Sequence, residues 1–497
     1  MKSPKAKSGK IARGPITFGI LLATVMSALD TTVVNVALPH MQGNLSASPD
    51  QITWVLTSYI VAVAVATPVS GWLVARFGVR AMLLACIAGF TLASALCGAA
   101  ASLPQIVLFR VIQGIFAAPL IPTAQAVLMN INPPERLGRA MAMFVMASMV
   151  APVLGPVVGG FLTEDYSWRW CFYINLPAGA GAMVLLWRYL PREALQPRPF
   201  DFLGFGSLAL AVSSFQLMLD RGTTQDWFGS REICTEAAIA ATALCVYLAH
   251  TFTTRNPLFP LPLFRDRNLV TSVVLNFFLM AVMYCSLMLL PLMMQGVLGY
   301  SVIHSGVLSM PRGLIMLTVL YAMGRLDGVV SRQVLVAIGI CFVMAAFWQM
   351  SRFDLSMSGR DIIRATALQG IGQGLIFVPL ATLGFSTIPQ ALRPDASALS
   401  NLLRNLGGSV GVAAMQGLTV ANTQTEHASL AAHITASNPA MLPDALSPVG
   451  VAALNAEITR QATMVAYVDD FWLMGVVSLL CFAMVLLLLR QPKARLG

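Results

Sequence analysis

Two opposite charges lie inside long apolar stretches of this sequence. Asp30 belongs to the segment SALDTTVVNVALPHM at residues 27–41, and Arg110 begins the segment RVIQGIFAAPLIP at residues 110–122. Charges within a membrane usually face the interior of a helix bundle, form pairs and mark ion pathways or proton relays. Asp30 and Arg110 are therefore candidates for proton coupling. The alternative is a static ion pair that locks two helices together.

The composition indicates that these charges are in a membrane. The chain is 57% hydrophobic and only 10% charged, with a mean hydropathy of +0.75, whereas soluble domains carry about 25% charged residues. Apolar stretches of about 18 to 25 residues recur, which is the length of a helix that crosses about 30 Å of hydrocarbon. We predict an all-α polytopic membrane protein with fourteen transmembrane helices.

The positions of the basic residues predict the orientation. Most of the 31 lysine and arginine residues fall on one side when the N-terminus is cytoplasmic, so both termini are predicted to be cytoplasmic. Asp30 is then about 12 Å, and Arg110 about 9 Å, from the outer end of its helix at 1.5 Å per residue. We attribute the net charge of +10 to the basic residues of the cytoplasmic segments, which are attracted to the lipid surface. We expect no nucleic-acid partner.

A weak internal repeat predicts the domain organisation. The segment RVIQGIFAAPLIP resembles TALQGIGQGLIFVP at residues 366–379, and both contain QGI. Duplicated halves with a site at their interface are typical of transporters. The predicted parts are a basic tail (1–14), an N-terminal six-helix bundle (15–190), two inserted helices (200–252), a C-terminal six-helix bundle (268–489) containing a long outer loop (422–468), and a second cytoplasmic tail (490–497).

Further polar residues lie inside the predicted helices. Cations could line a substrate cavity, or extend to lipid headgroups and backbone carbonyls. Amides could bond a substrate or only a neighbouring helix. The cavity candidates are Gln113, Asn276, Arg312, Gln369, Gln373 and Arg404.

Two glycine-rich stretches are candidates for gating or close helix packing. The segment APVLGPVVGG at residues 151–160 allows close contact and a bend in the fifth helix, although ordinary tight packing explains it equally. The segment GWLVARFGVR at residues 71–80 is a short basic turn. The glycines and proline of interest are Gly71, Gly78, Gly155, Pro156, Gly159 and Gly160.

Several chemistries are not expected. No lysine occurs between residues 13 and 491, so no GxxxxGK[ST] nucleotide loop is present. HExxH is absent as well, and the eight cysteines have no paired CxxC spacing typical of a metal site. We expect no catalytic residues, no metal and no cofactor. An ion gradient or a partner would then supply the energy for transport.

These segments together resemble the major facilitator superfamily, and specifically its fourteen-helix drug:H+ antiporters of the EmrB/QacA type. LDTTVVNVALP and RVIQG resemble the motifs of the first and fourth helices, LGPVVGG with WRWCFYINLP resembles the antiporter motif and its following loop, and LDRGTTQDWF resembles the EmrB branch. Two positions depart from the family pattern. Ala75 replaces the aspartate of the loop between the second and third helices, and Ala151 replaces the first glycine of the antiporter motif.

The resemblance implies a multidrug exporter of the bacterial inner membrane. Asp30 would couple protons to export, and the protein would work with a periplasmic adaptor and an outer-membrane channel. A proton-coupled uptake symporter is the serious alternative, while a receptor, a channel or a membrane enzyme fits less well. Because Asp30 is the one deep acid against three deep arginines, we expect neutral or weakly acidic hydrophobic substrates, with methionines providing adaptable walls.

Overall fold

The computed structural model describes residues 12–191, 195, 198–326, 330–433 and 448–485. The described chain is a succession of α-helices with short 3-10 turns, which confirms the predicted all-α class. Residues 1–11 of the predicted tail 1–14, and the whole tail 490–497, lie outside the described residues. The chain divides into two compact units: unit 1 is Met1–Ser213, Thr242–Phe264 and Ile388–Leu402, and unit 2 is Ser214–Ala241, Arg265–Thr387 and Leu403–Gly497.

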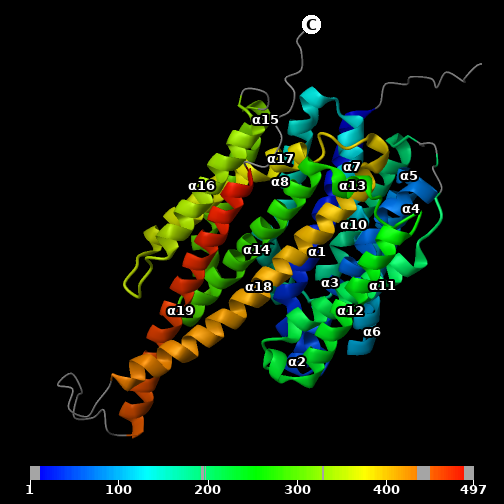
Figure 1. Cartoon of the computed structure of the whole chain (residues 1–497). Coiled ribbons are helices and arrows are strands. Elements are labelled where there is room, and N and C mark those ends of the chain that lie inside the picture. The colour runs from blue at the N-terminus through cyan, green and yellow to red at the C-terminus, as the bar shows by residue number, and fades with distance from the viewer. Residues whose placement is uncertain (1–11, 192–194, 196–197, 327–329, 434–447, 486–497) are drawn as a thin grey trace, which may run out of the picture. The chain divides into compact units, whose positions relative to one another are not determined.

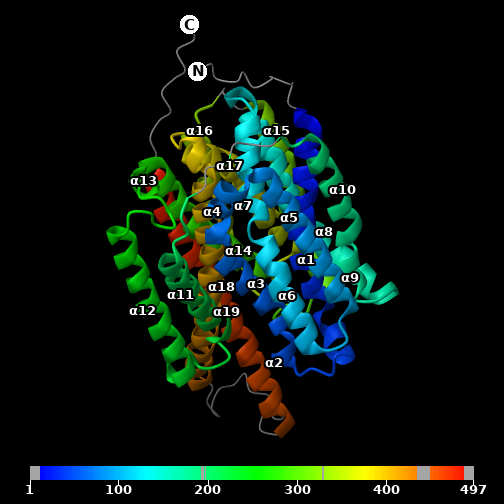
Figure 2. The same ribbon diagram turned by 90° about the vertical axis from the view of Figure 1, so that its right-hand side faces the viewer.

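Unit 1 contains the N-terminal series of helices. They are α1 (Arg13–Asn44), α2 (Pro49–Ile52), α3 (Trp54–Ala66), α4 (Ser70–Phe77), α5 (Val79–Ala99), α6 (Leu103–Ala117), α7 (Leu120–Ile131), α8 (Pro134–Asp165), α9 (Trp170–Tyr173) and α10 (Asn175–Tyr189). Helix α1 packs against α8 and α10, α5 packs against α6 and α10, and α3 packs against α6. Figure 2 shows α1, α5, α6 and α10 side by side.

Local sequence explains where several of these helices begin and end. Ser48 caps α2 in a capping box with Gln51, an arrangement that satisfies two otherwise unpaired backbone donors. Gly78 separates α4 from α5 with a φ of +82°. Residues with a side chain rarely adopt this left-handed conformation, so the predicted tight turn requires glycine at position 78.

Unit 2 contains the second series. Its helices are α14 (Arg267–Gly296), α15 (Val302–Leu326), α16 (Arg332–Met350), α17 (Gly359–Gly384), most of α18 (Arg393–Ala432), and α19 (Pro448–Val485). Helix α17 packs against α14, α15 and α16, and α19 packs against α14 and α16. A buried core of leucine, methionine and phenylalanine side chains joins these helices. The two inserted helices, α11 (Phe202–Arg221) and α12 (Arg231–Thr253), contribute to both units, and the short α13 (Pro262–Arg265) precedes α14.

The helix count is compatible with the prediction. Among the described residues, twelve helical segments are long and apolar enough to cross a membrane. The two other predicted spans, at 138–163 and 397–421, fall within the long helices α8 and α18. The chain is therefore a multi-pass membrane protein.

The described residues of the predicted outer loop 422–468 are largely helical, so the prediction of a loop was wrong for them. Helix α18 continues to Ala432 and α19 begins at Pro448, while residues 434–447 lie outside the described part. The mild polarity of the segment suggested a loop, but its alanine, glutamine and glutamate residues favour helix. Figure 1 shows the end of α18 and the beginning of α19 in orange, lying together, where His427 and Asn455 form a hydrogen bond of 3.0 Å.

Candidate functional site

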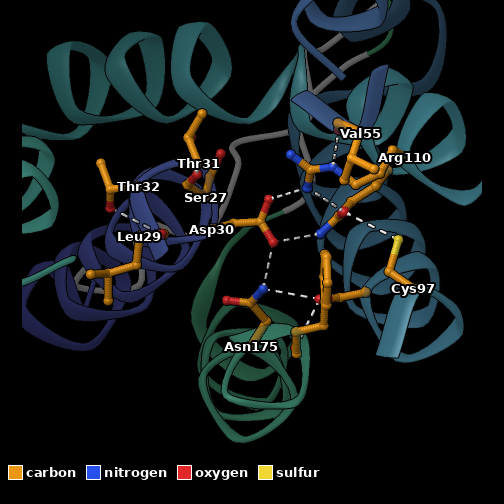
Figure 3. A network of polar contacts seen from close by, with 12 residues as sticks. Ser27, Leu29, Asp30, Thr31, Thr32, Val55, Cys97, Arg110 and Asn175 are labelled. Atoms are coloured by element: carbon orange, nitrogen blue, oxygen red, sulfur yellow. Dashed lines mark hydrogen bonds and ion pairs between the residues drawn. The ribbon is translucent and has the colours of Figure 1, made fainter. Parts of the chain in front are cut away.

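The two predicted charges meet inside unit 1. Arg110 Nη1 lies 2.5 Å from Asp30 Oδ2, and both side chains are 0% exposed. Asp30 comes from α1 and Arg110 from α6. A buried ion pair needs further hydrogen bonds to offset the loss of hydration, and the surrounding side chains provide them (Figure 3).

Two amides complete the environment of the Asp30 carboxylate. Gln113 Nε2 donates to Asp30 Oδ1 at 2.9 Å, and Asn175 Nδ2 donates to the same oxygen at 2.8 Å. Gln113 Oε1 in turn accepts from Arg110 Nη1 at 2.8 Å. Gln113 is fully buried and both ends of its amide are bonded within this network, while its place in a substrate cavity stays a prediction.

Arg110 is held by the backbone and by an aromatic ring. Its Nε donates to the Val55 carbonyl of α3 at 3.0 Å, and its guanidinium carbon lies 4.0 Å from the centre of the Tyr59 ring. A cation over an aromatic face is stabilised by the ring quadrupole, more so when desolvated. Its Nη2 has no hydrogen-bond partner among the described residues.

A glycine brings α6 close enough to α3 for this contact. A Cβ added to Gly114 would lie 2.8 Å from both the Ala62 Cβ and the Tyr59 carbonyl oxygen. Real Cβ atoms essentially never come this close, so position 114 accommodates no larger residue without separating the helices. Gly114 therefore permits the approach of Arg110 to Val55.

Asn175 and Ser94 were not among the residues predicted from sequence. Asn175 Nδ2 also lies 2.9 Å from the Ser94 Oγ, which donates to the Phe172 carbonyl. The signal for Asn175 was its place in WRWCFYINLP, a segment singled out only for its resemblance. Ser94 has no comparable sequence signal, because hydroxyls commonly bond the helix backbone.

The antiporter-motif glycines allow α8 to approach α1 beside Asp30. A Cβ on Gly155 would overlap the Thr32 side chain, and a Cβ on Gly159 would lie 3.2 Å from the Val33 carbonyl oxygen. By contrast, a Cβ on Gly160 would meet nothing within 4 Å. Pro156 lies within α8, but its side chain is outside the described part. Close packing is thus observed at two of the four predicted positions.

The basic turn at residues 71–80 contacts an acid from a distant segment. A Cβ on Gly71 would overlap the carboxylate of Asp395, which pairs with Arg198 at 2.5 Å. Burial raises the pKa of the Asp395 carboxyl, and the Arg198 guanidinium opposes this shift. Ala75 stands where the family resemblance leads us to expect an aspartate, but a different acid, Asp395, lies against the same turn. Asp395 was not predicted from sequence.

The remaining cavity candidates lie in unit 2 and do not form one network. Gln369 pairs with Ser286 of α14, with Nε2 and Oγ 2.8 Å apart. Arg312 is 9% exposed, and in the described part of the chain its Nη1 has no partner, as is true of the Asn276 Oδ1. Gln373 is buried in α17 and Arg404 is half-buried in α18. The described hydrogen bonds join none of these five residues to another.

One contact of Gln369 is similar to one of Gln113, the glutamine of the other QGI segment. Gln113 bonds Asp30 of α1, and Gln369 bonds Ser286 of α14. A Cβ on Gly370 would overlap the Arg312 backbone, as one on Gly114 would crowd the Tyr59 backbone. Each unit thus contains a similar hydrogen bond from a glutamine. In unit 1 the glutamine bonds the carboxylate of the Asp30–Arg110 ion pair, whereas in unit 2 it bonds the hydroxyl of Ser286.

Comparisons with known proteins agree with this arrangement. The profile of the Major Facilitator Superfamily matches residues 20–412. The human organic anion transporter MFSD10 has a similar structure, with a TM-score of 0.63, 13% identity, and coverage of 94% of this chain and 99% of that chain. The proton:xylose symporter XylE has a TM-score of 0.60 at 15% identity, with coverage of 93% and 94%. These structures show the fold alone.

Relatives that align over nearly the whole chain are named for multidrug export or for fatty acid resistance. The Multidrug export protein EmrB of Haemophilus influenzae is 36% identical, with 94% of each chain covered. EmrB of Escherichia coli is 33% identical, covering 95% of this chain and 94% of the relative. The Fatty acid resistance protein FarB of Neisseria gonorrhoeae is 34% identical, with coverage of 99% and 98%. Fold, site and matches together define a membrane transporter. The chain belongs to the Major Facilitator Superfamily.

Proposed function

We propose that this chain exports hydrophobic compounds across the bacterial inner membrane in exchange for protons. The observation that carries the proposal is the fully buried Asp30 carboxylate, held by Arg110, Gln113 and Asn175. Export is supported by the name of the relative EmrB, which aligns over 94% of this chain. Two bundles at 15–190 and 268–489, with an insertion at 200–252, complete the proposed organisation.

The network can exist with Asp30 ionised or with Asp30 protonated, and these two states would couple proton binding to a conformational change. When Asp30 is ionised, its charge joins α1 to Arg110 of α6, and charge-assisted bonds of this kind contribute about 1.5–3 kcal/mol each. A proton on Asp30 removes the ionic attraction, which shifts an equilibrium between conformations about tenfold for each 1.4 kcal/mol. The close contact of α8 with α1 at Gly155 and Gly159 would transmit a movement of α1.

The charges of unit 2 favour neutral or weakly acidic substrates. Arg312 is nearly buried, and within the described residues its Nη1 has no partner. A carboxylate or another acceptor on a substrate would satisfy this donor. The fatty acid resistance named for FarB agrees with this substrate class. We therefore assign Arg312 to substrate binding, and propose Asn276, Gln369, Gln373 and Arg404 as further cavity residues.

Transport into proteoliposomes with an acidic lumen tests this function. Antiport moves substrate inward as protons leave, whichever way the protein is inserted, whereas proton symport moves it outward. We expect neutral and permanently anionic hydrophobic fluorophores to accumulate above the level of protein-free liposomes, and matched dications to accumulate less. Sulfonate and quaternary ammonium groups are chosen because they do not titrate. Valinomycin with equal potassium on both sides holds the membrane potential at zero.

Arg312→Gln should lower accumulation of the anionic probe about tenfold and of the neutral probe much less, because one charge-assisted bond is lost. The matched control is Arg364→Gln, since the Arg364 side chain is 71% exposed. Accumulation only with an alkaline lumen would indicate an uptake symporter. A clear preference for dications would contradict the proposed substrate class.

We also propose that the extended ends of α18 and α19 bind a periplasmic adaptor that leads to an outer-membrane channel, with both chain termini cytoplasmic. Helices of 40 and 38 residues are about 60 and 57 Å long, roughly twice the hydrocarbon thickness. Their ends must therefore continue beyond the bilayer. The apolar Val449 is 80% exposed there and Val451 is 52% exposed, as expected of a surface that a partner covers.

Shortening the hairpin formed by the extended ends of α18 and α19 should preserve transport but reduce resistance. Replacing residues 426–455 with a short glycine-serine linker is expected to leave proteoliposome transport unchanged, because the deleted residues lie outside the network. Resistance of cells that express the adaptor should fall several-fold. The measurements are probe accumulation in liposomes and growth inhibition at matched membrane abundance, with Glu457→Gln as a control for a surface change. Full resistance of the shortened chain would exclude the hairpin as the adaptor site.

A further inference from the structure

Unit 2 contains a second buried carboxylate that the proposed coupling network does not use. Asp470 lies in the middle of α19 and is 1% exposed. Its Oδ2 accepts a hydrogen bond from Thr419 Oγ1 of α18. The Thr419 Oγ1 also lies 2.8 Å from the Met415 carbonyl oxygen, one turn earlier in its own helix. Asp470 was not among the residues predicted from sequence, because the predicted helix was shorter than α19 and Asp470 fell at its end.

Asp470 has no cation beside it in the described part of the chain, and no described ion pair includes it. The ionisable groups that interact with it are Asp469 and Tyr467 of α19 and Cys285 of α14. From α16, apolar side chains such as Phe347 pack against α19. An ionised carboxylate in such surroundings lacks the compensation that Arg110 gives to Asp30, and an uncompensated buried charge is costly.

The protons of this site can be counted. The Thr419 hydroxyl has one hydrogen, yet two acceptors lie within hydrogen-bond distance of it. If Asp470 is ionised, the hydroxyl can satisfy only one of them at a time. If Asp470 is protonated, its own O–H donates to Thr419 Oγ1, and the Thr419 hydroxyl donates to the Met415 carbonyl. The geometry therefore has a place for one additional proton.

We propose that Asp470 is a second proton-binding site, located in unit 2, and that its proton load determines the hydrogen bonding of Thr419 between α19 and the α18 backbone. Proton binding at Asp470 is independent of the direction of transport. Its use in coupling, through a second proton carried in the exchange cycle, rests on the proposed function. Unit 2 would thereby contain a titrating acid at a place different from Ser286, the residue that bonds Gln369.

Infrared difference spectroscopy of the full-length protein in lipid tests the proposal. Spectra are recorded between acidic and alkaline buffer in an Asp30→Asn background, so that the network of unit 1 contributes no carboxylic acid band. We expect a C=O stretching band of a protonated carboxylic acid that disappears as the pH rises and is absent when Asp470→Asn is added. Thr419→Val should shift this band, because the carboxylic acid then loses its hydrogen-bond acceptor.

The neighbouring Asp469 provides a matched control, since it is exposed and immediately adjacent. Asp469→Asn should leave the frequency of the buried band at acidic pH unchanged, because loss of this neighbouring charge changes only the pH at which the band disappears. A band that survives Asp470→Asn, or that is lost equally in Asp469→Asn, would overturn the proposal, as would a band unaffected by Thr419→Val. Asparagine preserves the volume of Asp470 and can still donate to Thr419, so the variant is expected to fold. Because the spectra require no transport, failure of the export function would leave this test intact.

Discussion

Replacing Asp30 with asparagine is expected to abolish substrate accumulation driven by a pH gradient, to the level of protein-free liposomes. The amide keeps the volume of the side chain and offers Arg110 an oxygen acceptor, but it cannot bind and release a proton. Exchange of labelled for unlabelled substrate without a gradient should continue, because binding and conformational alternation need no proton transfer. The measurement is gradient-driven uptake beside substrate exchange in the same proteoliposomes.

The chain offers a matched control for this substitution in Asp226, an exposed loop residue with a φ of +56°. Asparagine tolerates this left-handed conformation, so Asp226→Asn makes the same chemical change without strain. It should leave both measurements unchanged. If Asp30→Asn retained gradient-driven accumulation at equal amounts of protein, Asp30 would not be the coupling acid. Loss of both uptake and exchange would indicate a structural role.

The ion pair could be predicted from sequence because it depends on depth along the helix. Hydropathy located the membrane segments, and counting residues from their ends placed Asp30 and Arg110 at similar depths. A charge at such depth must be compensated, which leaves few partners to choose from. The same reasoning did not find Asp470, because α19 begins well before the predicted span and the residue was counted as lying at its end.

Neutral polar partners could not be predicted in the same way. Gln113, Gln369 and Asn175 can bond a substrate, a helix or a carboxylate, and the rotation of each helix about its axis decides which. That rotation follows from close packing, such as Gly114 against Tyr59, and packing is not specified by hydropathy. Contacts between distant segments, such as Asp395 with Arg198 and Gly71, are even less accessible, since neither segment contains a signal for the other.

Removing Arg110 is expected to destabilise the protein strongly, but only while Asp30 is a carboxylate. Arg110→Ala leaves a buried charge with amide donors alone, and breaking a buried pair in this way costs about 3–5 kcal/mol. Thermal unfolding in detergent should therefore show a large fall in Tm. In the Asp30→Asn background the same substitution should lower Tm much less, because no charge is left uncompensated. The difference between the two backgrounds measures the coupling of the pair.

Arg110→Lys separates charge from geometry in the same experiment. Lysine keeps the positive charge, but its ammonium cannot reproduce the planar fork that bonds Asp30, Gln113 and the Val55 carbonyl while lying on Tyr59, so the two residues are not interchangeable here. Its Tm should fall between those of wild type and Arg110→Ala. Arg76→Ala controls for loss of an arginine, because Arg76 is exposed on α4. Equal falls in Tm for Arg110→Ala in both backgrounds would show that Asp30 and Arg110 are not energetically coupled, and the network would then be no basis for proton-dependent movement of α1.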